Sequence, residues 1–316
     1  MKAAVLHTFG EAPRYESFAD PVPGEGEVTV TVTAAALNHY DRNVASGKHY
    51  ESGSPDSLPR IPGAVGVGRL ADGTRVSFTG VRAPFGAMAE QAVVPQQLCI
   101  PLPDQVSDET AAALFNPAIS QWMALDWRAG FQRGESILVL GATGVTGRLA
   151  VQIARLLGAG HVVGAGREEA SLEAVRALGA DAIVRLSGDK ETDAAALWEA
   201  SGKTGYDVVL DYVWGPVAET ALAMPGRASR TRYLQIGAMA GAEIRLSAQV
   251  LRAGGWELMG SGSGTMPPME QLLGYARSVL THAATGRLTI DVEIHPLADV
   301  ESVWPSTPRA RVVFRP

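Results

Sequence analysis

A glycine-rich turn between an apolar run and a helix-like pattern constrains the fold of this chain more than any other segment. The run 137–140 is typical of a buried strand, and the apolar positions of 149–157 have the spacing of one helix face. A strand, a glycine turn and a helix can hold a pyrophosphate, because glycines let the backbone approach phosphates and the helix N-terminus offers N–H groups. We therefore predict a dinucleotide site; the alternative is a tight turn without a ligand. The candidate residues are Gly141, Ala142, Thr143, Gly144, Val145, Thr146 and Gly147.

The end of the next short strand, 161–164, indicates which dinucleotide binds. An NAD site usually has an acid about 20 residues beyond the glycines, and this acid binds the ribose 2′-hydroxyl. This chain has Gly166 and Arg167 there instead, and a guanidinium can bind the 2′-phosphate of NADP(H) through forked hydrogen bonds. The pattern therefore favours NADP(H) over NAD(H). The alternative is that Arg167 is a solvated loop residue near Glu168 and Glu169.

Two kinds of pattern divide the chain and predict two domains. Residues 1–115 combine short alternating runs with Pro and Gly turns, which is typical of a barrel-like β domain. Residues 116–266 alternate strand and helix patterns, which predicts an α/β fold with a doubly wound parallel sheet. Residues 267–316 are too short to fold alone, and we expect them to complete the first domain. The strands expected in the parallel sheet are 136–140, 161–164, 182–184, 207–211, 232–236 and 256–260.

Composition and charge narrow the classes of function. Hydrophobic residues make up 46% of the chain and charged residues 19%, as in soluble globular proteins. The net charge is −6 and no basic stripe runs along the sequence, so we expect no nucleic-acid partner. The sequence shows neither a signal-peptide pattern nor an apolar stretch of membrane-spanning length, and Cys99 is its one cysteine. We expect a cytoplasmic protein without a membrane partner.

Further segments share an order and spacing with a known family. These segments are Met1–Val5, Ala36–Asp41, Ala45–Tyr50, Ile61–Gly66, Ala150–Ala154, Leu178–Asp181 and Asp207–Asp211. Together with the glycine turn, they resemble the zinc-free medium-chain dehydrogenase/reductases of the NADPH:quinone oxidoreductase group, the relatives of zeta-crystallin. The resemblance runs nearly end to end. It implies a GroES-like β-barrel catalytic domain with an inserted Rossmann domain, NADP(H) as cofactor, a small electrophilic substrate and a homodimer.

The glycine turn itself departs from the family in one respect. The family often has Gly-Gly-Val-Gly where this chain has Gly144, Val145, Thr146 and Gly147. The outer glycines that the turn needs remain. We therefore still expect the turn to bind the cofactor.

The ligand positions of a catalytic zinc are not filled in this sequence. Zinc-containing members of the superfamily place a Cys where this chain has Asn38, and a His-Glu pair where it has Ala64 and Val65; their structural zinc uses four cysteines. A catalytic zinc needs three protein ligands. His39 and His49 are close in sequence but lack a third ligand at a suitable spacing. We therefore predict no metal site.

The expected lack of zinc favours reduction of a polarised acceptor, because nothing would stabilise the alkoxide of a simple alcohol. Hydride transfer to a quinone or an enone develops charge on the carbonyl oxygen, which a hydrogen bond can stabilise. By resemblance, Tyr50 lines the substrate cleft and can donate that bond, while Asn38 holds the nicotinamide ribose or the substrate. The alternatives are a half-buried packing tyrosine and an Asx turn. We expect Asp41 to fix the geometry of this loop.

Other candidates come from the resemblance and from the carboxyl ends of the predicted strands. Ser120 is expected near the nicotinamide by resemblance. Gly237 and Ser261 follow the fifth and sixth strands of the parallel sheet, where a glycine can admit the nicotinamide closely; an ordinary turn is the alternative for Gly237. The candidate pocket residues are Tyr40, Tyr50, Trp122 and Tyr212.

These features predict a zinc-independent reductase that uses NADPH to transfer a hydride to a quinone, an enone or a related electrophile. A tailoring enoyl or carbonyl reductase of a biosynthetic pathway, acting on a larger substrate, is a close alternative. An NADPH-binding protein without turnover is the second class. The substrate itself is not named by the sequence, because pocket loops vary freely on one fold.

Overall fold

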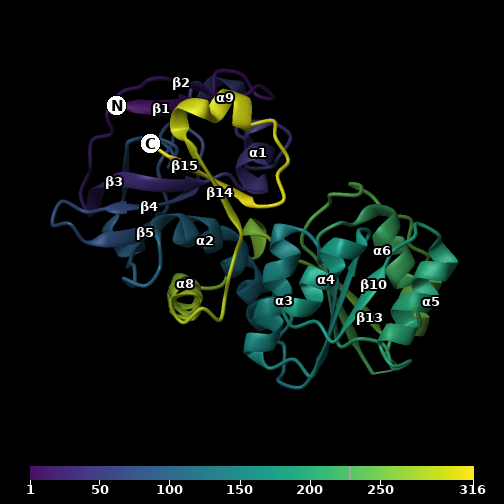
Figure 1. The fold of residues 1–316 in the computed structure, drawn as a ribbon. Coiled ribbons are helices and arrows are strands. Elements are labelled where there is room, and N and C mark those ends of the chain that lie inside the picture. The colour runs from purple at the N-terminus through teal and green to yellow at the C-terminus, as the bar shows by residue number, and fades with distance from the viewer. Residues whose placement is uncertain (228) are drawn as a thin grey trace. The chain divides into compact units, whose positions relative to one another are not determined.

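The structure is a computed structural model that describes residues 1–227 and 229–316 (Figure 1). The chain divides into two compact units. Unit 1 contains residues 1–117 and 273–316, and unit 2 contains residues 118–272. The chain leaves unit 1 within helix α2 (Asp108–Trp122) and returns to it within helix α8 (Met269–Ala284).

Unit 2 is built on a six-stranded parallel sheet with the order β10-β9-β8-β11-β12-β13. The chain runs from β8 outward to β10, crosses to β11 and continues to β13, so the topological switch point lies between β8 and β11. The predicted doubly wound sheet is confirmed, and strand ends shift by two residues at most. The strands are β8 (Ser136–Leu140), β9 (His161–Gly166), β10 (Ala182–Arg185), β11 (Val208–Asp211), β12 (Thr231–Gln235) and β13 (Trp256–Gly260).

Helices alternate with these strands (Figure 1). Helix α3 (Val145–Leu157) buries its apolar face, including Leu149 and Ile153, as the helical spacing predicts. It ends at Gly158, whose φ of +91° is the left-handed conformation that glycine adopts readily. No helix in the described part of the chain is long and apolar enough to cross a membrane. The other helical segments are η3 (Met123–Arg128), α4 (Glu169–Ala177), α5 (Lys190–Ala200), α6 (Gly215–Leu222), α7 (Ala248–Gly254) and η4 (Ser263–Thr265).

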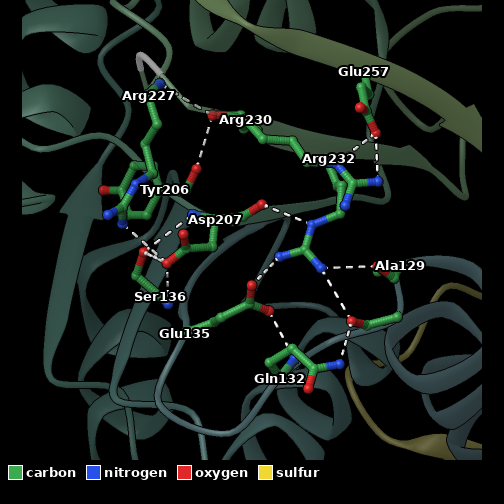
Figure 2. Close-up of polar contacts among 12 residues, drawn as sticks. Ala129, Gln132, Glu135, Ser136, Tyr206, Asp207, Arg227, Arg230, Arg232 and Glu257 are labelled. Carbon is green, nitrogen blue, oxygen red and sulfur yellow. Dashed lines mark hydrogen bonds and ion pairs between the residues drawn. The ribbon is translucent and has the colours of Figure 1, made fainter.

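A polar network joins the amino ends of β8, β11 and β12 (Figure 2). Asp207, just before β11, accepts hydrogen bonds from the backbone N–H and the hydroxyl of Ser136, both at 2.8 Å. Arg232 is buried, pairs with Glu135 and donates to the carbonyl of Ala129 at 2.8 Å. A buried charge is tolerated when it is paired and hydrogen-bonded in this way. The network stabilises the end of the strands opposite to the glycine turn.

Unit 1 is a β structure with the strand order β14-β15-β3-β4-β5-β7, and β6 also pairs with β3. In β3 (Glu27–Ala36), Val30 and Val32 are buried while Thr31 is exposed, as the alternating pattern predicts. Strand β15 (Arg311–Arg315) pairs antiparallel with β3, so the C-terminal segment completes a sheet that the first segment begins.

The remaining elements of unit 1 are the other strands of this sheet, a further pair of strands and short helical segments. Strands β1 and β2 form a separate antiparallel pair. These elements are β1 (Lys2–Val5), β2 (Arg14–Ser17), α1 (His39–Ala45), η1 (Pro55–Ser57), β4 (Val65–Arg69), β5 (Arg75–Thr79), β6 (Gln91–Pro95), η2 (Gln96–Leu98), β7 (Cys99–Pro101), β14 (Val292–Pro296), η5 (Leu297–Asp299) and α9 (Val300–Val303).

Candidate cofactor site and active site

Glycine occurs at three positions of the turn between β8 and α3 for different structural reasons. Gly141 has a φ of +80°, in the left-handed region. A β-carbon on Gly147 would lie 2.3 Å from the carbonyl oxygen of Gly141, so helix and strand meet too closely for any side chain. Gly144, the exposed N-cap of α3, has a φ of −75°, and a β-carbon there would meet nothing closer than 3.5 Å. Folding therefore requires Gly141 and Gly147, whereas the open space at Gly144 fits the approach of a ligand.

The start of α3 presents backbone N–H groups that the protein does not use. Among the described residues, no backbone oxygen accepts from the N–H groups of Thr143, Val145, Thr146 or Gly147. The N-cap residue is Gly144, so no capping side chain accepts from them. The other three predicted turn residues do bond within the protein, for Gly141 and Ala142 donate to Ala165, and Gly144 donates to Gly141. Four such donors at the positive end of a helix can bind an anion.

The end of β9 lies against this turn. A β-carbon on Gly166 would be 2.7 Å from Cγ2 of Thr143, so the close approach requires glycine. The next residue, Arg167, is exposed, and no hydrogen bond or ion pair joins its side chain to another residue of the described chain. Arg185, at the end of β10, is the β-sheet partner of Gly166 and lies 3.9 Å from Glu169. Arg167 and Arg185 therefore stand at the carboxyl ends of two neighbouring strands, β9 and β10.

Arg185 was missed by the sequence analysis. It stands one residue beyond the predicted strand 182–184, and the residues after a strand of a parallel sheet are where ligand contacts are expected. That position is the signal that could have found it. Its closeness to Gly166 depends on the register of two strands that a helix separates in sequence.

The carboxyl ends of β11, β12 and β13 bring further predicted residues to the same edge of the parallel sheet. Gly237 follows β12, and a β-carbon there would lie 2.5 Å from the carbonyl oxygen of Tyr212, so the neighbouring loop already requires glycine. Ser261 follows β13 and is 7% exposed. Its buried Oγ has no hydrogen-bond partner in the described chain. A buried hydroxyl without a partner is costly, so a polar group of a ligand would be stabilised by a hydrogen bond to it.

Of the three other predicted residues of unit 2, two are buried. Tyr212 is buried, and its hydroxyl donates to the side chain of Gln121. Burial, and secondly the charge of Asp211, raise the pKa of this phenol, so it stays protonated. Trp122 is also buried in α2, whereas Ser120 is only partly buried there. Tyr212 can thus line a pocket with its ring, but its hydroxyl already has a protein partner.

In unit 1, a buried carboxylate orders the loop that begins α1. Asp41 accepts from the backbone N–H of Asn38 at 2.9 Å, from the side-chain amide of Asn38 at 3.1 Å and from the N–H of Ala64 at 3.1 Å. Burial raises the pKa of Asp41, and these donors act against that rise. The loop-fixing role expected for Asp41 fits this geometry. Oδ1 of Asn38 is buried without a hydrogen-bond partner in the described chain, so it is available to a ligand.

Basic side chains surround this loop. Arg311 is buried and donates to the carbonyl of Leu37 at 2.9 Å, and burial lowers the pKa of its guanidinium to about 10. Burial, followed by the charges of Arg311 and Arg42, lowers the pKa of His39 from its usual 6.5. His39 is therefore neutral at pH 7.

Tyr40 and Tyr50 belong to one aromatic group on unit 1. The Tyr50 side chain is 72% exposed, and its ring stacks on His49 with centroids 4.1 Å apart. The Tyr40 hydroxyl donates to Glu51 at 2.7 Å. Burial and that hydrogen bond raise the pKa of Tyr40. Of the two tyrosines, Tyr50 is the more exposed.

No group of three His, Cys, Asp or Glu side chains that could hold a metal ion occurs among residues 1–227 and 229–316. His39 and His49, the pair noted in the sequence, lie in separate surroundings. His39 is near Arg311 and Arg42, whereas His49 lies between Tyr40 and Tyr50.

Comparisons with known proteins identify the family of this chain. Residues 145–276 match a family described as zinc-binding dehydrogenase. The chain is similar to a probable NADPH-dependent quinone reductase, tdiC, of Emericella nidulans, with 30% identity over 364 residues that cover 100% of both chains. It is 25% identical to an NAD-dependent alcohol dehydrogenase of Sulfolobus acidocaldarius, over 88% of this chain and 89% of that one. The solved quinone oxidoreductase of Thermus thermophilus, also solved with NADPH, has a TM-score of 0.84 at 28% identity, with 100% of both chains covered.

The likeness to tdiC extends over the whole chain, and the likeness to the Thermus thermophilus structure extends over the whole fold. The fold is therefore the α/β arrangement of a GroES-like β domain and a Rossmann domain that the resemblance implied. The chain belongs to the medium-chain dehydrogenase/reductase family, in its NADPH:quinone oxidoreductase-like group.

Proposed function

We propose that the protein is an NADPH-dependent reductase of a quinone, an enone or a related electrophilic small molecule. The observation that carries the proposal is the anion site at the start of α3, which has Arg167 and Arg185 beside it and no acid at the end of β9. This combination fits a dinucleotide with a 2′-phosphate. The tdiC relative is named as NADPH-dependent, and the Thermus thermophilus enzyme was solved with NADPH, which supports the same cofactor here.

Each part of the cofactor has candidate partners on this chain. The unpaired N–H groups of the glycine turn would hold the pyrophosphate, and Arg167 with Arg185 would hold the 2′-phosphate. The unpartnered Oγ of Ser261 and Oδ1 of Asn38 would bind polar groups of the nicotinamide ribose or of the substrate. Ser120 and Gly237 are assigned by resemblance to the nicotinamide, and Tyr212 and Trp122 to the pocket wall. When bound, the reduced cofactor supplies the hydride.

The chain's own contribution to the reaction is orientation and hydrogen bonding. As the acceptor is reduced, charge develops on its carbonyl oxygen, and we assign the Tyr50 hydroxyl to donate a hydrogen bond to that oxygen. Tyr50 is exposed, so water can deliver the proton and re-protonate the phenol. We propose that no zinc takes part, because Asn38 replaces the cysteine ligand of the zinc enzymes.

We also infer a homodimer, formed through the edge of the parallel sheet. In the described chain, β13 pairs on one side with β12 and presents its other edge unpaired. Leu258 on this strand is 36% exposed, and Leu251 on α7 is exposed as well. An open edge with apolar side chains is a surface that a second copy can cover.

For the compartment we propose the cytoplasm, because Cys99 cannot form an internal disulfide.

Calorimetric titration of NADPH and NADH tests the cofactor proposal. The parent should bind NADPH more tightly, and Arg167→Ala should lose about 1.5–3 kcal/mol, or one to two decades, for NADPH alone. Arg176→Ala is the matched control, since Arg176 is an exposed arginine of α4 that pairs with Glu173. Equal affinity of the parent for NADH and NADPH would show that the interpretation of Arg167 is wrong.

A screen of acceptors with a chelator present tests the reaction. NADPH oxidation with naphthoquinones or simple enones supports the proposal, whereas oxidation with larger enoyl or carbonyl substrates alone supports a tailoring reductase. Tight NADPH binding with no oxidation identifies a non-catalytic binder. Activity that needs an equivalent of bound zinc contradicts the zinc-independent mechanism.

A further inference from the structure

Tyr50 stands in a turn that its own hydrogen bonds close. The carbonyl of His49 accepts from the N–H of Ser52 at 2.9 Å, and the N–H of His49 donates to the Ser52 hydroxyl at 3.2 Å. Nδ1 of the His49 ring accepts from the N–H of Glu51 at 3.2 Å, while the ring itself stacks on Tyr50. Ser52 is 2% exposed and Tyr50 is 72% exposed. The turn therefore has a buried base and an exposed tip that carries the phenol.

The base of this turn is held by one arginine from another segment. Nη1 of Arg60 donates to the carbonyl of Ser52 at 2.9 Å, and its Nη2 donates to the carbonyl of Val44 at 3.3 Å. The guanidinium lies over the ring of Phe9, 5.2 Å from its centroid. Donors that carry a charge make the stronger hydrogen bonds, and the forked guanidinium can serve two carbonyls at once. Arg60 thus joins the turn to the last turn of α1.

The main chain of Arg60 is fixed to the core of unit 1. Its N–H donates to the carbonyl of Leu6 at 3.1 Å, and the N–H of Leu6 donates back to its carbonyl at 2.8 Å. Leu6 is fully buried. The guanidinium therefore reaches the turn from a rigid point. The turn itself is flanked by Gly47 and Gly53, which have φ values of +76° and +77° and add no side chain that could hold it.

We propose that Arg60 is a positioning residue for acceptor reduction, because it holds the Ser52 carbonyl and thereby fixes the turn that presents Tyr50. The inference rests on the proposed function, in which the Tyr50 hydroxyl donates to the acceptor oxygen. Arg60 does not touch the acceptor in this scheme. Arg60 instead raises the fraction of time in which the Tyr50 hydroxyl is positioned to donate to the acceptor.

Turnover with a saturating acceptor tests the effect. Arg60→Gln should lower kcat about five- to tenfold with little change in NADPH affinity, because a hydrogen bond used mainly in the transition state is misplaced. The kcat of Arg60→Lys should lie between those of the parent and Arg60→Gln, since an ammonium can still donate to one of the two carbonyls. Arg69→Gln is the matched control, because Arg69 donates to the Gly73 carbonyl in another turn of unit 1.

A double-mutant cycle separates positioning from general damage to the fold. If Arg60 acts through Tyr50, then Arg60→Gln should cost less than about twofold once Tyr50→Phe has removed the hydroxyl. A loss of the same size in both backgrounds would overturn the proposal. An unchanged kcat for Arg60→Gln in the parent background would overturn it as well.

Hydrogen exchange tests the anchoring without any turnover. In Arg60→Gln, the amides of His49, Glu51 and Ser52 should exchange at least about tenfold faster, while the Leu6 amide keeps its rate. If none of the acceptors supports NADPH oxidation by the parent protein, the proposed function fails. Hydrogen exchange alone then decides whether Arg60 anchors the turn. Unchanged exchange at these three amides overturns the anchoring whether or not the protein is a reductase.

Discussion

Two glycines of the same turn should respond to alanine in opposite ways. A β-carbon on Gly147 would lie 2.3 Å from the carbonyl oxygen of Gly141 and 2.6 Å from Cα of Ala142. Both are backbone atoms, so no side chain can rotate away. Gly144 has an ordinary φ, and its nearest neighbour would lie at 3.5 Å. Gly147→Ala should therefore damage the fold, and Gly144→Ala should damage ligand binding.

The magnitudes follow from the geometry. Ordinary contacts begin near about 3.5 Å, so Gly147→Ala must move α3 roughly 1 Å away from β8. Such overpacking costs up to about 3 kcal/mol, and the helix propensity of alanine returns about 1 kcal/mol. A net loss of about 2 kcal/mol lowers Tm by roughly 4–8 °C in a domain of about 150 residues. At Gly144 the loss of an N-cap glycine should cost only about 0.5–1 kcal/mol.

For stabilisation by NADPH, we expect Gly144→Ala to have the larger effect of the two substitutions. At one hundred times Kd, NADPH should stabilise the parent by about 2.7 kcal/mol. If the phosphates bind at Gly144 as we propose, a methyl group there should weaken binding about tenfold and remove roughly half of that stabilisation. Calorimetric scans with and without NADPH measure both effects, and Gly264→Ala, which has open space around it, is the control.

Two results would refute the reasoning. A Tm of Gly147→Ala within about 1 °C of the parent would show that helix and strand are not packed as closely as the structure has them. A full NADPH shift in Gly144→Ala would show that the phosphates do not approach the start of α3.

The remaining predictions concern the active site and the assembly. Tyr50→Phe should lower turnover about tenfold and leave NADPH affinity nearly unchanged, because water partly replaces the exposed hydroxyl; a parental rate with every acceptor would leave Tyr50 a packing role only. Asn38→Ala should slow all acceptors alike in stopped-flow hydride transfer, whereas an effect confined to one acceptor would place Asn38 on the substrate. Light scattering should give twice the 33.2 kDa of one chain, and Leu258→Lys should halve that mass; a monomeric parent contradicts the dimer.

Local sequence patterns were sufficient for the architecture of unit 2. The strands 136–140 and 256–260 have the predicted ends, and the helical face after the glycine turn is the buried face of α3. These features can be predicted locally, because the spacing of an element's own apolar residues indicates which of its faces is buried. The end of β9 was predicted two residues too early, since Ala165 and Gly166 lack the β-branched character of the preceding valines.

The tertiary contacts of individual site residues were harder to predict from the sequence. Gly237 was expected to admit the nicotinamide or to form an ordinary turn, and the structure adds a packing reason for glycine, because the carbonyl oxygen of Tyr212 is 2.5 Å from where a β-carbon would stand. Tyr212 was expected as a pocket residue, and its hydroxyl is occupied by Gln121, which lies 91 positions earlier in the chain. Neither contact has a signal in the sequence around the residue itself, because both partners come from other elements.

By itself, the sequence determined the parallel sheet, the glycine turn, the cationic end of the second strand and the family. Tertiary structure alone decided which distant polar groups meet: Arg185 beside Gly166, and Arg60 beneath the Ser52 carbonyl. The physical reason is that periodicity reports how each element is buried, whereas a long-range hydrogen bond depends on strand register and on the path of loops between elements. Only the folded chain shows which buried donors and acceptors have a hydrogen-bond partner and which, such as Oγ of Ser261, have none among the described residues.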